Sequence, residues 1–163
     1  VIDTPLPFDF DVAAGTVNVS IWRGVRNILF LGGNIVGPGY VSARSPGVGE
    51  AGITSRFAQN IAVIGTNVRH MQGAVGWLAR THGATWIGGE HIGRPDDYAD
   101  AVVEGDNAGF TGIWAYESAA VNFESIRGRR LRHLIDGARS SNVVVAGCQA
   151  TDCHRAPFTT HTG

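Results

Sequence analysis

The sequence repeats one short segment, in which an Asn or a small residue is followed by alternating apolar residues and, five positions later, by Gly or Ser. The clearest copy is residues 141–148, SNVVVAGC. Residues 26–32 and 59–65 repeat it closely, and residues 82–88 and 119–125 repeat it more loosely. This repeat restricts the possible folds more than any other feature, because a repeat architecture determines the whole fold.

The five copies agree position by position. The Asn position falls at residues 27, 60, 83, 120 and 142, which gives intervals of 33, 23, 37 and 22 residues. Two intervals indicate a unit of about 22 residues, and the other two are that unit with an insertion. One residue past the Asn position every copy is apolar: Ile28, Ile61, Ala84, Val121 and Val143. Three past it every copy is bulky and apolar: Phe30, Val63, Trp86, Phe123 and Val145.

Apolar residues at every second position predict a β-strand with one buried face. The Gly or Ser at the end of each copy is the residue type that a sharp turn favours. A strand that returns about every 22 residues leaves no room for the helical crossover of a βαβ unit. The sequence therefore predicts an all-β parallel β-helix. A β-sandwich of many short strands is the alternative, but it does not require columns at a fixed interval.

The repeat also predicts how the chain is divided. Residues 1–15 read as an extended lead-in, and residues 16–163 as the β-helix domain, which starts with an alternating strand over 16–22. Two loop insertions are expected, a Gly-rich one at 37–52 and an acidic one at about 93–109, where a short helix has room. We expect a segment of a longer polypeptide, since the chain starts without Met and no cap follows the last coil.

The composition restricts the classes of partner that the chain is expected to bind. The net charge is −1, so charge gives no indication of nucleic acid or of an anionic membrane. No apolar run approaches the ~20 residues of a membrane-spanning helix, and the sequence shows no secretory signal. Cys148, Cys153, His154 and His161 form a conceivable zinc set, but their spacing departs from that of structural zinc sites. We predict no metal and no cofactor, and cysteines that are buried or lie in turns.

A second strand is expected before each Asn position. Six residues before it stand Trp77, Trp114 and Asp136 on three successive coils. Because an unpaired buried carboxylate is costly, this column is predicted to point outward. Two stacked Trp with polar neighbours suit a sugar ring, whose apolar C–H face lies on the aromatics. The alternative is that both Trp fill space beneath an insertion.

Three residues before the Asn position stand Arg80, Glu117 and Arg139. On coils about 4.8 Å apart they would form a ladder of alternating charge. Its simplest role is that of a solubilising salt ladder, in which each pair is worth less than about 1 kcal/mol.

The repeated N-[IV]-x-Φ-x-G coil, with Φ bulky and apolar, resembles the right-handed parallel β-helix of the pectate-lyase-like superfamily over roughly residues 16–163. The resemblance concerns the fold and not a reaction. That superfamily includes secreted polysaccharide lyases and glycosidases, and bacteriophage tailspikes and tail fibres that bind or degrade cell-surface glycans. The sequence has neither a secretory signal nor a recognisable lyase or polygalacturonase motif, which favours the phage kind.

The resemblance implies a β-helix segment of a phage tail fibre or tailspike-like virion protein that contacts host cell-surface glycan. It further implies a location in the phage tail or outside the cell. The implied partners are bacterial surface polysaccharide, other copies of the chain in a homotrimer, and other tail proteins; no nucleic acid and no membrane insertion is expected. The alternatives are a polysaccharide lyase or glycoside hydrolase, and an adhesin or structural spacer.

Whether the chain is an enzyme stays open in the sequence. A glycosidase needs two carboxylates about 5 to 9.5 Å apart, for which Asp136 and Glu117 are the candidates. A lyase needs a base beside an Arg or His, for which His133, Arg139 and His161 are available. Residues 154–161 are dense in polar groups, or equally a structural turn. The candidate catalytic residues are Asp136, Glu117 and His161. The candidate substrate-binding residues are Trp77, Trp114, Arg80, Arg139 and Arg155.

Overall fold

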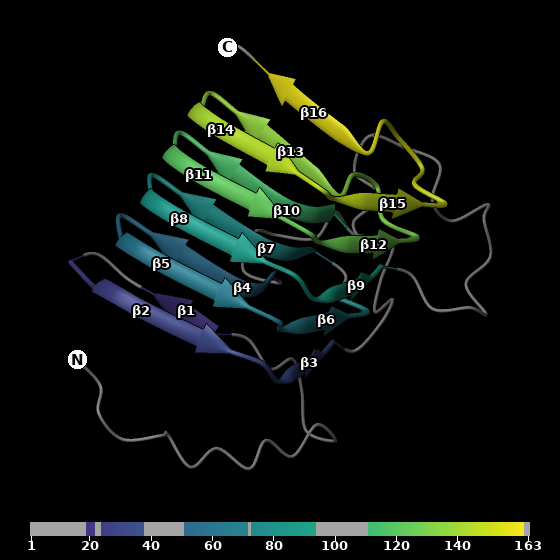
Figure 1. Ribbon diagram of the computed structural model, residues 1–163, viewed down its shortest axis with the longest axis horizontal. Coiled ribbons are helices and arrows are strands. Elements are labelled where there is room, and N and C mark those ends of the chain that lie inside the picture. Colours follow the sequence, from purple (N-terminus) through teal and green to yellow (C-terminus); the bar gives the residue numbers. More distant parts are fainter. Residues whose placement is uncertain (1–18, 22–23, 38–50, 72, 94–110, 162–163) are drawn as a thin grey trace.

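The structure, a computed structural model, describes residues 19–21, 24–37, 51–71, 73–93 and 111–161. Within these residues every helix or strand assigned is a β-strand, and each strand pairs in parallel with its equivalents in the neighbouring coils (Figure 1). The strands stack in chain order, so the fold is the predicted right-handed parallel β-helix. The described residues contain no helix long and apolar enough to cross a membrane.

The strands form three sheets, called A, B and C here. Sheet A consists of β1 (Val19–Ile21), β4 (Ala51–Arg56), β7 (Ala74–Ala79), β10 (Thr111–Tyr116), β13 (Ile135–Ala138) and β16 (Phe158–His161). Sheet B consists of β2 (Arg26–Leu31), β5 (Gln59–Ile64), β8 (His82–Ile87), β11 (Ala119–Glu124) and β14 (Ser141–Ala146). Sheet C consists of β3 (Asn34–Val36), β6 (Asn67–Arg69), β9 (Glu90–Ile92), β12 (Arg127–Arg129) and β15 (Gln149–Thr151).

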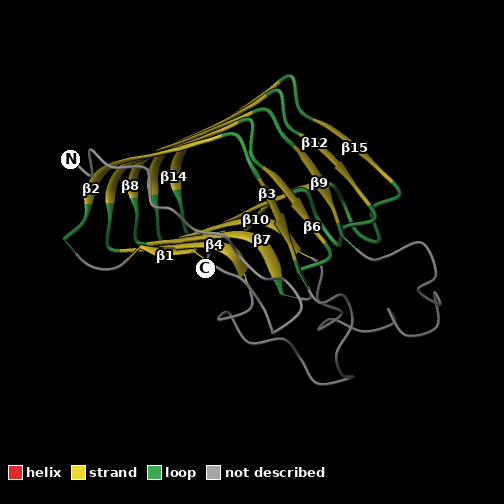
Figure 2. Ribbon diagram, turned by 90° about the horizontal axis from the view of Figure 1, so that it is seen from below, coloured by secondary structure: helices red, strands yellow, loops and turns green. Residues whose placement is uncertain are grey.

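Each coil therefore runs through A, B and C in turn, whereas the sequence predicted two strands per coil. Figure 2 shows sheets A and B facing each other, with sheet C closing one side of the interior. The strands of sheet C were missed because each has three residues and only its middle residue points inward. A single inward residue gives no alternation that the sequence could reveal.

The predicted columns are confirmed by the register of sheet B. Ile28, Ile61, Ala84, Val121 and Val143 are direct neighbours along the stack. Phe30, Val63, Trp86, Phe123 and Val145 form a second such column. In the three middle coils both columns are buried, with Phe123 0% and Trp86 1% exposed. Val145, in the last coil, is 42% exposed because no described strand stacks on β14.

The Asn position is a left-handed corner, and Asn or Gly occupies it in every coil except that of Ala120, which has φ of 55°. Asn27, Asn60 and Asn142 have φ of 56°, 54° and 52°. Asn tolerates this conformation better than most residues, and Gly83, with φ of 72°, adopts it freely. The Asn60 side-chain amide also donates to Asn27 Oδ1 at 3.1 Å, so the corner is stabilised between coils as well.

Several predicted boundaries fall outside the described residues. They include the lead-in 1–15, the start of the strand predicted over 16–22, and almost all of the insertion at 93–109 with its short helix. The first insertion was predicted to end at residue 52, which is wrong. Ala51 and Gly52 belong to β4 and are buried, because they already pair with the next coil.

Candidate functional site

The outer face of sheet A carries the residues that the sequence singled out. Trp77, Trp114 and Asp136 are in register on β7, β10 and β13, as predicted. The two indole rings stack, with ring centroids 6.2 Å apart and an angle of 27° between their planes. Both Trp residues are half-buried, and their inward neighbours on the same strands are buried. The outward direction of this column is therefore confirmed.

Two further side chains complete this aromatic cluster. Arg56 places its guanidinium carbon 4.3 Å from the ring centroid of Trp77, in a cation–π contact. Tyr116 packs its ring edge-on against Trp114, with centroids 5.9 Å apart. Trp77 is thus contacted by Arg56 from the coil before it and by Trp114 from the coil after it. Nε1 of both indoles is shielded from solvent and has no hydrogen-bond partner among the described residues, so the accessible atoms of the two rings are carbon atoms.

The predicted charge ladder is present at the corner between sheets A and B. Arg80 Nε lies 2.5 Å from one carboxylate oxygen of Glu117, and Arg139 Nη1 lies 3.6 Å from the other. The hydrogen bond from Arg80 lowers the pKa of the Glu117 carboxyl and raises that of Arg80 itself. Both Glu117 oxygens face arginines, and the low pKa keeps this carboxyl ionised. Glu117 therefore suits a structural ion pair better than a general acid, which must hold a proton.

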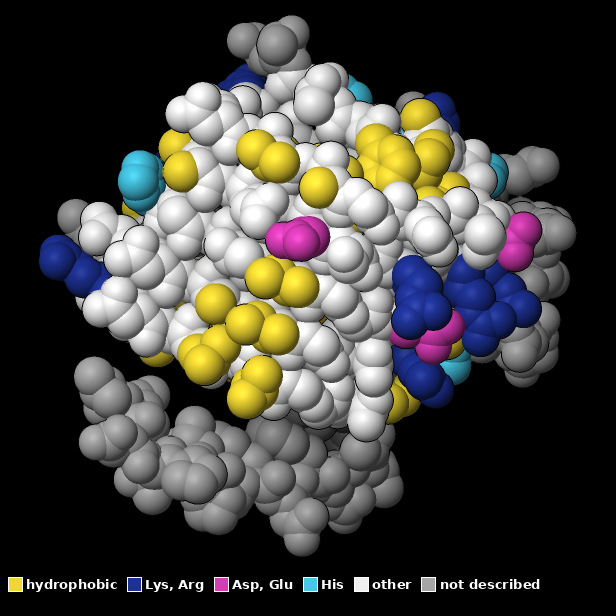
Figure 3. Space-filling model, in the orientation of Figure 1, with side chains coloured by type: hydrophobic (Ala, Val, Ile, Leu, Met, Phe, Trp, Pro, Cys, Tyr) yellow, Lys and Arg dark blue, Asp and Glu magenta, His cyan; other side chains and the backbone are white. Residues whose placement is uncertain are grey.

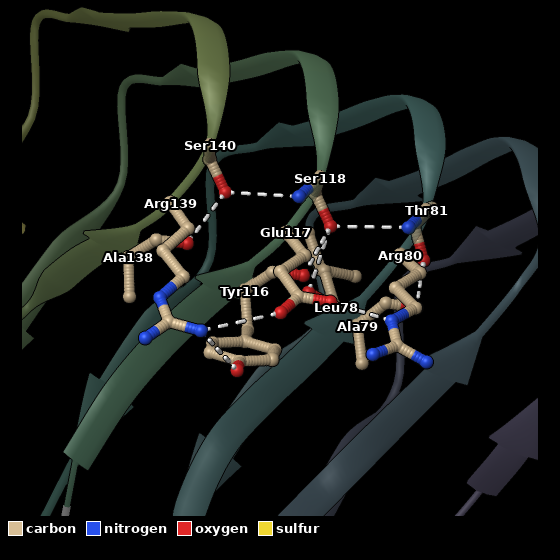
Figure 4. A network of polar contacts seen from close by, with 10 residues as sticks. All are labelled: Leu78, Ala79, Arg80, Thr81, Tyr116, Glu117, Ser118, Ala138, Arg139 and Ser140. Atoms are coloured by element: carbon tan, nitrogen blue, oxygen red, sulfur yellow. Dashed lines mark hydrogen bonds and ion pairs between the residues drawn. The ribbon is translucent and has the colours of Figure 1, made fainter. Parts of the chain in front are cut away.

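The backbone at this corner is fixed from the inside by a ladder of hydroxyl groups (Figure 4). Ser118 Oγ accepts the backbone N–H of Thr81 at 3.0 Å and donates to the carbonyl of Leu78 at 2.9 Å. Ser140 Oγ accepts the N–H of Ser118 at 3.0 Å. Each ladder residue on the surface is thus followed by a residue whose hydroxyl joins two coils, and this holds the surface arginines and Glu117 in line.

Asp136 and His161 meet on the same face as the Trp column. His161 Nε2 lies 3.4 Å from Asp136 Oδ1, and the side chain of Asp136 is 14% exposed. Asp136 is also in register with Thr159, whose hydroxyl is shielded from solvent without a hydrogen-bond partner. The structure therefore brings two of the three candidate catalytic residues together. Glu117 stands apart. Trp114 is the register partner of Asp136, and Glu117 lies three residues after Trp114 on that coil.

Two other candidates lie elsewhere. His133, one of the groups available as a lyase base, is 6% exposed, and its Nδ1 lies 2.7 Å from the carbonyl oxygen of Ala156. Arg155 lies between β15 and β16, where its backbone N–H donates to the carbonyl of Arg132 at 2.9 Å. The structure thus places Arg155 outside the strands that carry the Trp column.

The cysteines are free thiols that pack half-buried against the core of the last coil. Burial raises the pKa of both Cys148 and Cys153, so neither is an activated thiolate. Among the described residues, no group of three or more His, Cys, Asp or Glu side chains is arranged to hold a metal ion.

His91 is a polar residue that sequence reasoning missed. It points into the interior from sheet C, is 0% exposed, and lies edge-on to Trp86 with ring centroids 5.6 Å apart. Neither ring nitrogen has a hydrogen-bond partner among the described residues. Burial lowers its pKa to about 3. Its register partners, Val68 and Gly128, would have revealed this inward column had the third strand been recognised.

Comparison with known proteins returned no match: no family model, no curated protein and no solved structure is significantly similar to this chain.

Proposed function

We propose that this chain is a β-helix segment of a phage tail fibre or tailspike-like virion protein, and that it contacts host cell-surface glycan through the outer face of sheet A. The observation that carries the proposal is the stacked pair of Trp77 and Trp114, flanked by Tyr116 and Arg56. Half-buried aromatic rings on a regular sheet give a rigid apolar surface at little entropic cost, and sugar C–H groups pack well on such surfaces.

The polar groups beside the aromatic cluster suit the hydroxyl groups of a sugar. Asp136 and His161 lie at one end of the Trp column, and Arg80, Glu117 and Arg139 lie along the corner. Carboxylate, imidazole and guanidinium groups bind hydroxyls in fixed directions, and directional polar groups around an apolar surface are what a specific ligand site requires. Binding is favoured over hydrolysis because both oxygens of Glu117 already face arginines.

A polysaccharide-degrading enzyme is the second candidate, favoured by the pair of Asp136 and His161. Asp136 Oδ1 lies 3.4 Å from His161 Nε2 without forming a hydrogen bond. A small rotation of either side chain would form that bond and orient the imidazole as a general base, as a lyase reaction needs. This pair lies on the same face as the Trp column, where a bound glycan would reach it. An adhesin or structural spacer is a third role, in which neither the Trp column nor this pair touches a glycan.

Association with further copies of the chain is part of the proposal, and the outer face of sheet B fits it. Leu29 is 59% and Leu31 75% exposed, and apolar side chains gather over the sheet B strands (Figure 3). Past the corner residues the strands of sheet B have ten outward positions, of which only Glu124 is charged: Leu29, Leu31, Ala62, Ile64, Thr85, Ile87, Asn122, Glu124, Val144 and Ala146. A patch of this kind marks an interaction surface. Sedimentation that found a monomer at all concentrations would contradict this part.

The test of the proposed function is incubation with surface polysaccharides from candidate host bacteria. Retention of the protein on one of these glycans, with no new reducing or unsaturated ends, is the expected result. New ends that disappear in Asp136→Asn and His161→Ala would replace the binding role by an enzymatic one. If no glycan is retained and none is cleaved, the chain has a structural role instead.

A further inference from the structure

The outer face of sheet C carries arginines. Arg69 on β6, and Arg127 and Arg129 on β12, occupy outward positions, and Arg130 follows at the next corner. Figure 3 shows basic side chains gathered around an acidic one beside the sheet B face. The net charge of −1 conceals this region, because it averages the arginines with the acidic residues of the second insertion.

Two of these arginines lack a carboxylate partner. Glu90 lies 3.6 Å from Arg69 Nη2 and is thereby occupied. Among the residues that the structure describes, no ion pair involves Arg127 or Arg129, and the Nε of Arg129 is shielded from solvent without a hydrogen-bond partner. At the corner of sheets A and B, by contrast, Glu117 lies between Arg80 and Arg139. Glu90 is also the register neighbour of Arg127, so this one carboxylate stands among Arg69, Arg127 and Arg129. The described part of sheet C therefore has an excess of positive charge.

We propose that the outer face of sheet C binds a linear anionic polysaccharide through these arginines. Arg127 and Arg129 stand on the same side of β12, about 6.6 Å apart along the strand. Arg69 is two coils from Arg129, about 9.6 Å along the stack. A guanidinium binds a carboxylate, sulfate or phosphate group through two parallel hydrogen bonds. Buried Ile92 lies between Arg69 and Arg129, so the guanidinium groups are spaced apart on this face. Spaced groups of this kind suit a polymer with repeated charges, in which weak contacts act together.

The residues around the arginines favour a polysaccharide over a nucleic acid. Single-stranded nucleic acid binds by stacking its bases on aromatic rings. The outward strand positions of sheet C carry no aromatic residue: Asn34, Val36, Asn67, Arg69, Glu90, Ile92, Arg127, Arg129, Gln149 and Thr151. Gln149, in register with Arg127, presents an exposed amide for sugar hydroxyls. The choice of a polysaccharide among polyanions rests on the proposed glycan contact at sheet A.

The test uses affinity electrophoresis of the chain through gels that contain dextran sulfate, carboxymethyl dextran or neutral dextran of the same length. We expect retardation by the anionic polymers alone, with an affinity that falls steeply as salt is added. In R127Q/R129Q the affinity for the anionic polymers should fall about tenfold, with a shallower salt dependence. R26Q, which removes one positive charge from the edge of sheet B, is the control. Its affinity for the anionic polymers should fall less than about twofold, since Arg26 lies outside sheet C.

Three results would overturn the inference. They are retardation of R127Q/R129Q equal to that of the unmodified chain, equal loss of affinity in R26Q, and tighter binding of oligodeoxythymidylate than of either anionic dextran. The third would assign the arginines to nucleic acid. These results leave the sheet A proposal untouched, because that proposal is tested separately with W77A/W114A. Conversely, W77A/W114A could bind host glycan normally while R127Q/R129Q loses affinity for the anionic dextrans. Sheet C would then be a polyanion site whose natural ligand is not the host glycan. The two failures are therefore distinguishable.

Discussion

Replacing Gly76 by Ala is expected to lower the free energy of unfolding by about 3 kcal/mol, the upper end of the range for overpacking a core. Gly76 lies on β7 and faces the interior, where a Cβ would come 2.5 Å from Cζ3 and 2.7 Å from Cη2 of Trp86. Trp86 is 1% exposed, so its ring has no room to withdraw. Register partners of Gly76 in the coils before and after it are Ile53 and Ile113. Gly76 is thus the smallest residue at its position in the stack, and it faces Trp86, the largest residue of its own column.

Gly137 provides the matched control, since it also lies on a strand of sheet A and is buried. The nearest atoms to its added Cβ are 3.7 Å away, which is ordinary contact. G137A should therefore be neutral or stabilise by about 0.5 kcal/mol, because Ala loses less backbone freedom in a strand than Gly. In G76A/W86F the smaller ring should make the double variant more stable than the sum of the single changes predicts. Urea unfolding curves in which G76A and G137A coincide would contradict this packing.

The second large effect concerns His91 and the dependence of stability on pH. Burial holds its folded-state pKa at about 3, below the ordinary value of 6.5. Below pH 6.5 the unfolded chain binds a proton at this position that the folded chain does not, so stability falls as the pH falls toward 3. At up to about 1.4 kcal/mol per pH unit, the loss between pH 6.5 and pH 4 amounts to roughly 3 kcal/mol. Above about pH 7.5, where the unfolded chain no longer binds this proton, His91 contributes almost no slope.

His91→Leu removes this proton uptake and should flatten the pH dependence over that window. It should also raise stability at neutral pH by about 1 kcal/mol, since two buried ring nitrogens without partners are replaced by an apolar side chain. His82→Gln, at an exposed position on β8, is the control for the loss of a histidine. Chemical unfolding at a series of pH values measures all three proteins. Parallel curves for the unmodified chain and H91L between pH 7 and pH 4 would show that His91 is not the source.

Much of the fold can be predicted from the sequence because a parallel β-helix repeats each structural position once in every coil. Val121 and Phe123 have equivalents in every coil, so their inward direction follows from the column. The outward direction of the Trp column likewise follows from the carboxylate of Asp136. The charge ladder follows from the opposite charges of Arg80 and Glu117. These inferences need only a correct repeat and the cost of burying charge.

Other features depend on geometry that the repeat does not encode. His91 lies on a strand too short to show alternation. The stacking of Trp77 on Trp114 was predicted from adjacency, but the placement of Arg56 over Trp77 follows from the rotamer of one side chain. The net charge of the whole chain does not reveal the arginines of sheet C, because acidic residues elsewhere cancel them. Arg127 and Arg129 stand out only when the third sheet places both on one face.

The most direct measurement is the binding of host surface polysaccharide to W77A/W114A and to the unmodified chain, with His82→Ala as the control. His82 is an exposed ring-bearing residue at the start of β8 in sheet B, outside the Trp column. Each lost aromatic contact is expected to weaken binding by about 1 kcal/mol, which is about fivefold, so the double variant should lose at least tenfold. H82A should bind normally. Unchanged glycan binding by W77A/W114A would contradict the assignment of the Trp column as the glycan-contacting surface.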